Sequence, residues 1–401
     1  MGWLVVNLLF HLLTGSHGAQ STGQGFVGLD GDGNLALQSP AGSQLMVDGV
    51  ALMNELADLR ALILQQQSTM SQLNATVAAQ QRSIAQLNLI RLDYGFFGTI
   101  RTIDSAGDVG QFTSLALTTA GFPVISYFDN TNYDLKLAVC ADATCSSGTT
   151  IRTIDSAGSV GSHTSLALTT AGFPVISYFD VTNTDLKLAV CADATCSSGT
   201  TIRTIDGAGD VGEFTSLALT AAGFPVISYY DRTNGDLKLA VCADATCSSG
   251  TTIRTIDSTD DVGAYTSLTL TTSGFPVILY RDVTNGDLKL AVCADATCSS
   301  GTTIRTIDST RNAGSFTSLA LTTAGFPVIS YRDSTNDDLK LAVCGDATCS
   351  SGTTIRTIDS VGNVGYYMSL ALTAAGFPVI SYHDFTNGDL KVAACADATC
   401  F

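Results

Sequence analysis

The chain repeats one phrase of 51 residues six times, and this repeat restricts the possible folds more than any other feature of the sequence. Equivalent isoleucines recur at this interval, at Ile100, Ile151, Ile202, Ile253, Ile304 and Ile355. A period of this length is typical of propellers, solenoids and other arrays in which each repeat is one supersecondary unit.

Each repeat contains four segments with the composition of strands. In the first repeat they read TIRTID, FTSLALTTAG, FPVISYFD and DLKLAVCAD, rich in β-branched and aromatic residues and separated by turn residues. Six units of four strands predict an all-β six-bladed propeller over residues 99–401. An open solenoid would need terminal caps, which the repeats do not supply. TIRTID opens the first repeat but does not follow the last, so we expect residues 99–104 to pair with 389–396 and close the ring.

Twelve cysteines occur as six C-x4-C pairs, one pair in each repeat. Zinc sites usually combine C-x2-C pairs with further cysteines or histidines, and the repeats hold only His163 and His383. We therefore expect six disulfides: Cys140–Cys145, Cys191–Cys196, Cys242–Cys247, Cys293–Cys298, Cys344–Cys349 and Cys395–Cys400.

The N-terminal residues 1–19 have the pattern of a signal peptide. An apolar run from Trp3 to Leu13 is too short to span a bilayer, and small residues follow it, although no Lys or Arg precedes it. We expect a secreted chain with no membrane span after signal removal; the alternative is an uncleaved apolar anchor.

Residues 20–50 are rich in glycine and contain short alternating runs, which predict two or three short strands around Leu35–Leu37 and Leu45–Val47. DGDGN at 30–34 resembles a calcium loop. However, Leu35 stands where the loop needs glycine and Ala41 where it needs glutamate, so a plain turn is favoured.

Residues 51–91 predict a coiled-coil helix, joined to the repeats by a linker at 92–98. The a positions are Leu56, Ile63, Met70, Val77 and Ile84, and the d positions are Leu52, Leu59, Gln66, Leu73, Gln80 and Leu87. We expect a homo-oligomer through residues 52–87, a trimer in preference to a dimer; the alternative is a helix packed on the neighbouring domain. Asn74 lies in a glycosylation sequon off this seam.

The six copies vary on one face of the predicted propeller. The loops around AGFP and CADATC share a face, called here the Cys face, and hardly change. The DNTNYD and SAGDVGQF loops share the opposite face, called here the variable face. A fixed scaffold with varied loops on one side is a common design of binding surfaces.

Candidate ligand-binding residues all lie on this variable face. Their aspartate and asparagine oxygens could coordinate calcium or receive sugar hydroxyls, and their aromatic rings could stack on a ligand; the alternative is that the polar groups only satisfy turns. No other cofactor is expected. The candidates are Phe112, Phe128, Asp129, Asn132, Asp134, His163, Phe179, Asp180, Glu213, Tyr230, Asp231, Arg281, Asp282, Arg332, Asp333, His383 and Asp384.

Composition disfavours some functions. A formal net charge of −17 argues against nucleic-acid binding, which needs clustered Lys and Arg. Catalysis is not expected, because six nearly equal blades do not single out one acid and one base, and Glu213 is the only glutamate of the repeats. SAGDVGQFT resembles the Asp-box of sialidase-like repeats but differs in spacing and lacks its tryptophan.

The repeated phrase VGQFTSLALTTAGFPVISYFD, followed by DLKLAVC, resembles the tandem repeats of large secreted propeller-like proteins from bacteria and microbial eukaryotes. The resemblance implies a propeller and an extracellular setting but no activity. Residues 24–90 resemble the stalks of trimeric fibres. We expect a lectin-like, non-enzymatic protein that binds an extracellular glycan or surface protein. Two alternatives stay open: a structural or protein-interaction module of an extracellular coat, and a sialidase-like glycosidase.

Overall fold

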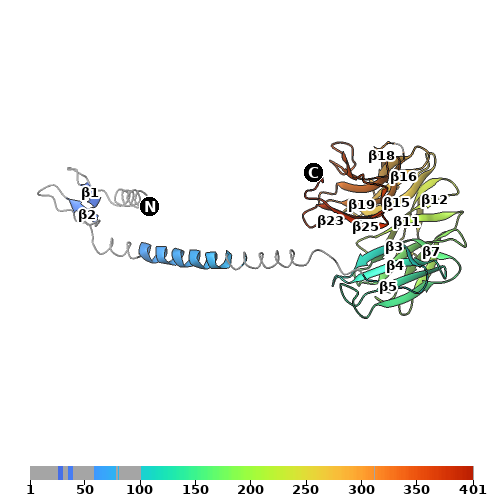
Figure 1. Ribbon diagram of the computed structural model, residues 1–401, viewed down its shortest axis with the longest axis horizontal. Helices are drawn as coiled ribbons and strands as arrows, with labels where there is room; N and C mark the ends of the chain where they lie inside the picture. Colours follow the sequence, from blue (N-terminus) through green and yellow to red (C-terminus); the bar gives the residue numbers. More distant parts are fainter. Residues whose placement is uncertain are drawn as a thin grey trace. The chain divides into compact units, whose positions relative to one another are not determined.

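The computed structural model describes residues 26–29, 35–38, 58–77, 80, 101–310 and 312–400 (Figure 1). The chain divides into two compact units, residues 1–98 and 99–401. The predictions of a signal peptide at 1–19, of strand alternation at Leu45–Val47, of a DGDGN turn at 30–34 and of a linker at 92–98 lie outside the described residues.

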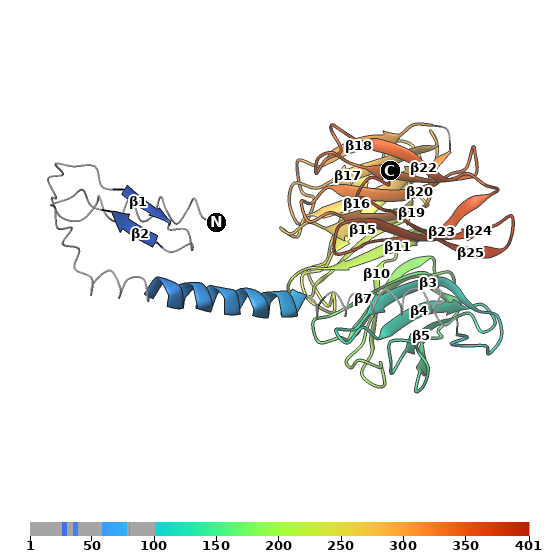
Figure 2. The ribbon, with the colours of Figure 1, turned by 60° about the vertical axis from the view of Figure 1, so that its left-hand side comes forward.

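The first unit contains a short hairpin and a helix, visible in Figure 2. Strands β1 (Phe26–Leu29) and β2 (Leu35–Gln38) pair antiparallel, with Phe26 opposite Gln38. The helix runs over residues 58–77, inside the segment predicted to be helical. Its apolar residues Leu59, Ile63, Met70, Leu73 and Val77 are 38–61% exposed.

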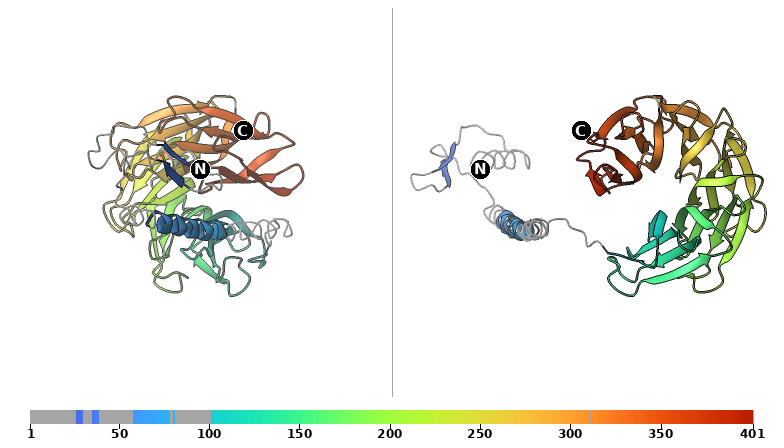
Figure 3. Two further views of the ribbon diagram at one scale, coloured as in Figure 1. Left: turned by 90° about the vertical axis from the view of Figure 1, so that its left-hand side faces the viewer. Right: turned by 45° about the vertical axis from the view of Figure 1, so that its right-hand side comes forward.

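The second unit is a six-bladed β-propeller. Each blade is an antiparallel meander, and successive blades follow one another around a common axis (Figure 3). The strands are, in blade one, β3 (Val109–Leu117), β4 (Pro123–Asp129), β5 (Asp134–Val139) and β6 (Thr150–Asp155); in blade two, β7 (Val160–Leu168), β8 (Pro174–Asp180), β9 (Asp185–Val190) and β10 (Thr201–Asp206); in blade three, β11 (Val211–Leu219), β12 (Pro225–Asp231), β13 (Asp236–Val241) and β14 (Thr252–Asp257); in blade four, β15 (Val262–Leu270), β16 (Pro276–Asp282), β17 (Asp287–Val292) and β18 (Thr303–Asp308); in blade five, β19 (Ala313–Leu321), β20 (Pro327–Asp333), β21 (Asp338–Val343) and β22 (Thr354–Asp359); and in blade six, β23 (Val364–Leu372), β24 (Pro378–Asp384) and β25 (Asp389–Ala394).

Apolar seams between neighbouring blades form the core. In the seam between blades two and three, Val175, Leu186 and Leu188 pack against Leu217 and Tyr229 of the next blade. The same cluster recurs at the other four seams between successive blades. Since blades two to five each contribute a face to both neighbours, their middle strands are buried on both sides, which suits the largely apolar run PVISY.

A buried polar clasp also crosses each of these seams. In blade three, Tyr229 Oη and Lys238 Nζ donate to Asp206 Oδ2 at 2.7 and 2.8 Å, and Asp206 ends the outermost strand of blade two. Lys238 Nζ also lies 3.4 Å from Asp231 of its own blade. Burial opposes ionisation of Asp206, but the hydrogen bonds from Lys238 and Tyr229 prevail and hold its pKa below the ordinary value.

Ring closure differs from the sequence expectation. The sheet of blade six has three strands, and residues 101–104 form no strand, so the predicted pairing of 99–104 with 389–396 is wrong for the described residues. The faces that would form a sixth seam are uncovered: Leu115 of blade one is 60% exposed and Leu390 of blade six is 76% exposed. In Figure 3 the first and last blades, teal and red, border the opening of the ring.

Asp104 explains where the opening segment goes instead. Its carboxylate accepts hydrogen bonds from Tyr127 Oη at 2.7 Å and Lys136 Nζ at 2.8 Å, both in blade one. These are the contacts that Asp155 makes with blade two. The segment is therefore anchored to blade one, and because blade six does not pack on blade one, the two strands expected to pair stay apart.

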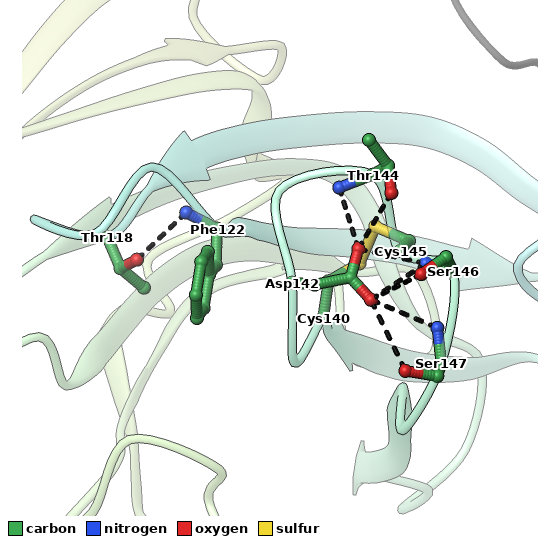
Figure 4. Close-up of a disulfide and its surroundings, with 8 residues drawn as sticks. All are labelled: Thr118, Phe122, Cys140, Asp142, Thr144, Cys145, Ser146 and Ser147. Carbon is green, nitrogen blue, oxygen red and sulfur yellow. Dashed lines mark hydrogen bonds between the residues drawn. A yellow bond between two sulfur atoms is a disulfide. The ribbon is translucent and has the colours of Figure 1, made fainter.

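The predicted disulfides are present in all six repeats. In Figure 4, Asp142 lies inside the Cys140–Cys145 loop and accepts hydrogen bonds from the backbone and hydroxyl groups of Thr144, Ser146 and Ser147. These bonds hold the pKa of Asp142 well below its usual range. The near-invariance of the Cys face thus has a structural cause, since its loop residues are bonded to one another.

Candidate functional site

An arc of six rings lines the axial end of the variable face. Each ring belongs to the fourth residue of the innermost strand of a blade, and neighbouring ring centroids along the arc lie 4.5–5.1 Å apart. The residues are Phe112, His163, Phe214, Tyr265, Phe316 and Tyr367. We call this set the aromatic arc.

A backbone irregularity positions the arc. All six residues have a positive φ, between 47° and 53°, which is uncommon for residues other than glycine. The ladder between β3 and β4 shifts register between Val109 and Gln111 and again between Gln111 and Ser114, the interval that contains Phe112. Each inner strand therefore carries a bulge near the variable face, and bulges of this kind re-aim side chains.

The arc and the residue after each ring line a shallow depression of about 220 Å³. The following residue is a threonine in five blades and Met368 in the sixth. The threonines are used by the scaffold: Thr164 and Ser126 share a hydrogen bond of 2.7 Å across a seam, and Thr266 donates to the carbonyl of Phe214 at 2.9 Å. The floor of the depression is thereby fixed in place.

The rings differ around the arc. His163 lies between Phe112 and Phe214, with both centroids 4.5 Å away, and burial lowers its pKa to about 4. His163 is therefore neutral above that pH and belongs to an apolar half. On the other half stand the hydroxyls of Tyr265 and Tyr367, neither of which hydrogen-bonds another group within the described part of the chain.

In the second strand of each blade, an invariant tyrosine (Tyr127 in blade one) is followed by a residue that varies between blades, and these varied residues surround the arc. Phe128, Phe179 and Tyr230 are buried, and Tyr230 Oη donates to Asp261 of the next blade at 2.5 Å. In the last three blades these positions are Arg281, Arg332 and His383. This position therefore carries an aromatic ring of Phe or Tyr in the first three blades and an Arg or His side chain in the last three.

The two arginines have different partners. Arg332 is buried, lies 4.3 Å from the Tyr366 ring centroid and is paired with the carboxylate of Asp337. Arg281 donates from Nη1 to Ser315 Oγ at 2.8 Å and from Nη2 to Asn312 Oδ1 at 3.2 Å, both neutral groups. His383 lies beside Tyr367, with ring centroids 6.5 Å apart.

The candidate aspartates of the variable face are occupied by the scaffold. Asp129 accepts hydrogen bonds from the backbone of Thr131 and Asn132 and from Asn132 Nδ2, each at 3.0 Å, and lies 3.5 Å from Lys136 Nζ. Asp134 pairs with Asp129 across the hairpin, and burial followed by the charge of Asp129 raises its pKa. The equivalent carboxylates Asp180, Asp231, Asp282, Asp333 and Asp384 are equally buried.

These contacts are those of the turn-stabilising interpretation. Calcium binding or sugar binding by the same oxygens stays a prediction. In the part of the chain that the structure describes, no three His, Cys, Asp or Glu residues are grouped so that they could hold a metal ion.

Glu213 lies next to the arc but has a charged neighbour. Burial raises its pKa, whereas Arg232, whose Nη1 lies 3.4 Å from Glu213 Oε1, lowers it; the charge of Asp210 raises it further. Arg232 Nη1 is also 3.8 Å from Asp210 Oδ2. The outcome is a raised pKa for the one glutamate of the repeats.

Sequence reasoning placed all six rings at one varied position of the repeat, but it selected only Phe112 and His163 as ligand candidates. The available signal was the interval of 51 residues between them. It also missed the clasp aspartates Asp104 and Asp155, whose partners lie 23 and 32 residues further along the chain.

No protein-family model and no curated protein sequence matches this chain. Solved structures share the propeller fold at low identity. An α-L-arabinofuranosidase, Arb93A from Fusarium graminearum, is 12% identical over 74% of this chain and 96% of its own, with a TM-score of 0.49. The SapL1 lectin in complex with α-methyl fucoside is 11% identical, over 71% and 93%, with a TM-score of 0.48. The Hadza microbial sialidase Hz136 is 12% identical, over 72% and 66%, also at 0.48. Similarities of this size concern the fold alone and extend neither to ligand nor to reaction.

In the described residues, no helix has both the length and the apolar character that crossing a membrane requires.

Proposed function

We propose that this protein is an extracellular binding protein that holds carbohydrate on the aromatic arc. The observation that carries the proposal is the arc itself, six rings that line one depression at the axis. A pyranose has an apolar face of C–H groups and a rim of hydroxyls, and concave sites that combine aromatic surface with a few polar groups suit such ligands. The hydroxyls of Tyr265 and Tyr367 supply polar groups at the edge.

The size of the depression restricts the ligand. Its volume of about 220 Å³ is below the ~300–1,000 Å³ of sites for drug-sized molecules. One sugar ring, or the end of a glycan chain, therefore suits the depression better than a long oligosaccharide. Most of the floor needs no rearrangement on binding, because four of its five threonines are already hydrogen-bonded across the seams.

Secretion belongs to the proposal. Six disulfides with no free cysteine in the described residues are typical of chains that fold in an oxidising compartment. A cytosolic setting would keep such pairs reduced. Detection of the chain in the medium of expressing cells, with all cysteines unreactive to a thiol reagent, is the expected result.

Several copies would act together through the helix at 58–77. Its heptad residues are exposed on the single chain, and a long helix with an uncovered apolar seam associates with copies of itself. Three linked propellers would convert weak single contacts into avidity. Sedimentation of the full chain is expected to give a trimer, and Ile63→Asp is expected to give monomers with an intact propeller.

The test is a glycan array probed with the secreted full chain, with calcium and with a chelator. Wild type is expected to bind a defined group of glycans. Tyr367→Ala is expected to weaken binding about tenfold, roughly 1.4 kcal/mol. Tyr367 is 71% exposed, so this substitution does not threaten the fold. Tyr133→Ala is the matched control, since Tyr133 is an exposed tyrosine of the variable face outside the arc.

Two results would overturn the proposal. Silence on the array in both buffers would leave a structural or protein-interaction module as the better function. Hydrolysis of a bound glycan that Glu213→Gln abolishes would make the protein a glycosidase.

A further inference from the structure

We infer from Arg281 that the ligand carries a carboxylate. The anion subsite for this group lies on the variable face between blades four and five, next to the aromatic arc. The protein therefore prefers acidic sugars. This inference rests on the proposed function and adds the chemical class of the ligand. It starts from the balance of charges on the face.

The lysines of the propeller and, apart from Arg281, the described arginines of the variable face lie beside carboxylates. The six lysines of the clasps each lie within 3.7 Å of two aspartates. On the variable face, Arg232 lies near Asp210 and Glu213, and Arg332 is paired with Asp337. Such pairing is expected in a chain with a formal net charge of −17.

Arg281 breaks this pattern. Among the described residues no carboxylate lies within ion-pair distance of its guanidinium, and its two acceptors, Ser315 Oγ and Asn312 Oδ1, are neutral. The equivalent of Asn312 is Asp261 in the preceding repeat, where it faces Tyr230. A carboxylate thus stands opposite the neutral tyrosine, and an amide stands opposite the cation.

The guanidinium keeps donors for a ligand. Each terminal nitrogen has two N–H groups and uses one of them on the protein. The remaining pair suits the two oxygens of a carboxylate, which arginine binds in a bidentate manner. Arg281 is partly buried, so the attraction is less screened than it would be on an open surface.

The proposed subsite lies beside the aromatic arc. Ser315, which holds Nη1, immediately precedes Phe316 of the arc. Tyr265 is the neighbour of Phe316 in the arc, with ring centroids 5.1 Å apart. A sugar ring on Tyr265 and Phe316 would therefore place a carboxylate substituent within reach of Arg281, while Arg332 remains occupied by Asp337 and Tyr366.

The experiment compares acidic glycans with their carboxyl methyl esters, which differ only in charge. Galacturonic, glucuronic and sialic acid-terminated glycans and their esters are immobilised, and the full chain is titrated onto each pair. We expect the acid form of at least one pair to bind about tenfold more tightly. Arg281→Gln is expected to remove that preference while it leaves binding of the ester unchanged.

Arg232→Gln is the control, because it removes the same charge from the same face at a site already paired with carboxylates. It is expected to keep the preference for the acid. Equal binding of acid and ester by wild type would overturn the anion subsite and leave the proposed function standing. A preference that survives in Arg281→Gln would also overturn it. Failure to bind either form of any pair, together with silence on the neutral array, would overturn the proposed function and the subsite with it.

Discussion

Leu186 of blade two and Leu390 of blade six occupy the same place in their repeats, but their surroundings differ completely. Leu186 is fully buried in a seam, whereas Leu390 is 76% exposed. The same holds for Leu166 and Leu115, which are 7% and 60% exposed. A repeat of this protein therefore does not have a stability of its own; the neighbouring blade supplies half of its core, as in other repeat architectures.

The largest expected effect is a difference between two identical substitutions. Leu186→Ala removes a leucine from a closed seam and should cost about 2–5 kcal/mol of the free energy of unfolding. Leu390→Ala should cost less than about 0.5 kcal/mol, because the side chain is already in water. Urea unfolding with intact disulfides measures both. Equal costs would break the comparison, since they would show that the face of blade six is covered in solution.

The clasps give the second contrast. Asp206→Asn removes a carboxylate that binds Tyr229 and Lys238, and the expected cost is about 1.5–3 kcal/mol, the range for hydrogen bonds to charged groups. Lys238 keeps Asp231 as a neighbour, which limits the loss. Asp359→Asn, in the last seam, should cost less because its partner Lys391 has a side chain that is 34% exposed, against 12% for Lys238. A larger cost at Asp359 would contradict this ranking.

The same carboxylates predict the response to acid. At Asp104 burial raises the pKa, but hydrogen bonds from Lys136 and Tyr127 outweigh it and bring the pKa to about 2. A carboxyl whose pKa is lower in the folded state stabilises fully above the unfolded value of about 3.9, and this contribution is lost as the pH falls through the folded pKa. The free energy of unfolding should therefore decrease between pH 4 and pH 2.

Asp104→Asn tests whether a clasp contributes to this pH dependence where no seam is packed. It removes a clasp that lies at the free end, where no seam is packed, and Asp206→Asn removes one inside a seam. Both variants should show a smaller decrease between pH 4 and pH 2 than wild type, followed by chemical unfolding at each pH. An unchanged decrease in both would assign the acid sensitivity to other carboxylates, of which those in the Cys loops, such as Asp142, come first.

Local patterns in the sequence predicted most of the fold. The four strand segments, the six blades and the six disulfides follow from composition, turn residues and the C-x4-C spacing, which act over a few residues. Closure was not predictable in this way, because it depends on packing between Leu115 and Leu390, which are nearly three hundred residues apart. The seam clasps were also hidden, since a Lys and an Asp 32 residues apart carry no local signal of contact.

The aromatic arc shows a second limit. Alternation along VGQFTSLAL assigns side chains to faces only if the ladder is unbroken. Here the register shifts just before Phe112 and again across it, and its φ is 50°, so the alternation rule fails at a residue of the proposed site. By contrast, the varied positions were visible without a structure, because the six copies could be compared within one chain.

The smallest difference is expected between the disulfides of two blades. They provide a reference for the comparison between a blade with packed seams, blade two, and a blade with an uncovered face, blade six. A disulfide acts mainly through the unfolded chain, and the loops of Cys191–Cys196 and Cys395–Cys400 have the same length. Replacing either pair by serines should therefore cost about the same, roughly 2 kcal/mol at most in the chain-entropy model. This equality is expected even though the seam substitutions differ strongly between the same two blades. If removal of Cys395–Cys400 left the main unfolding transition unchanged while removal of Cys191–Cys196 lowered it, blade six would unfold as a separate unit, because only an element that unfolds with the rest can pass its loop entropy to the global transition.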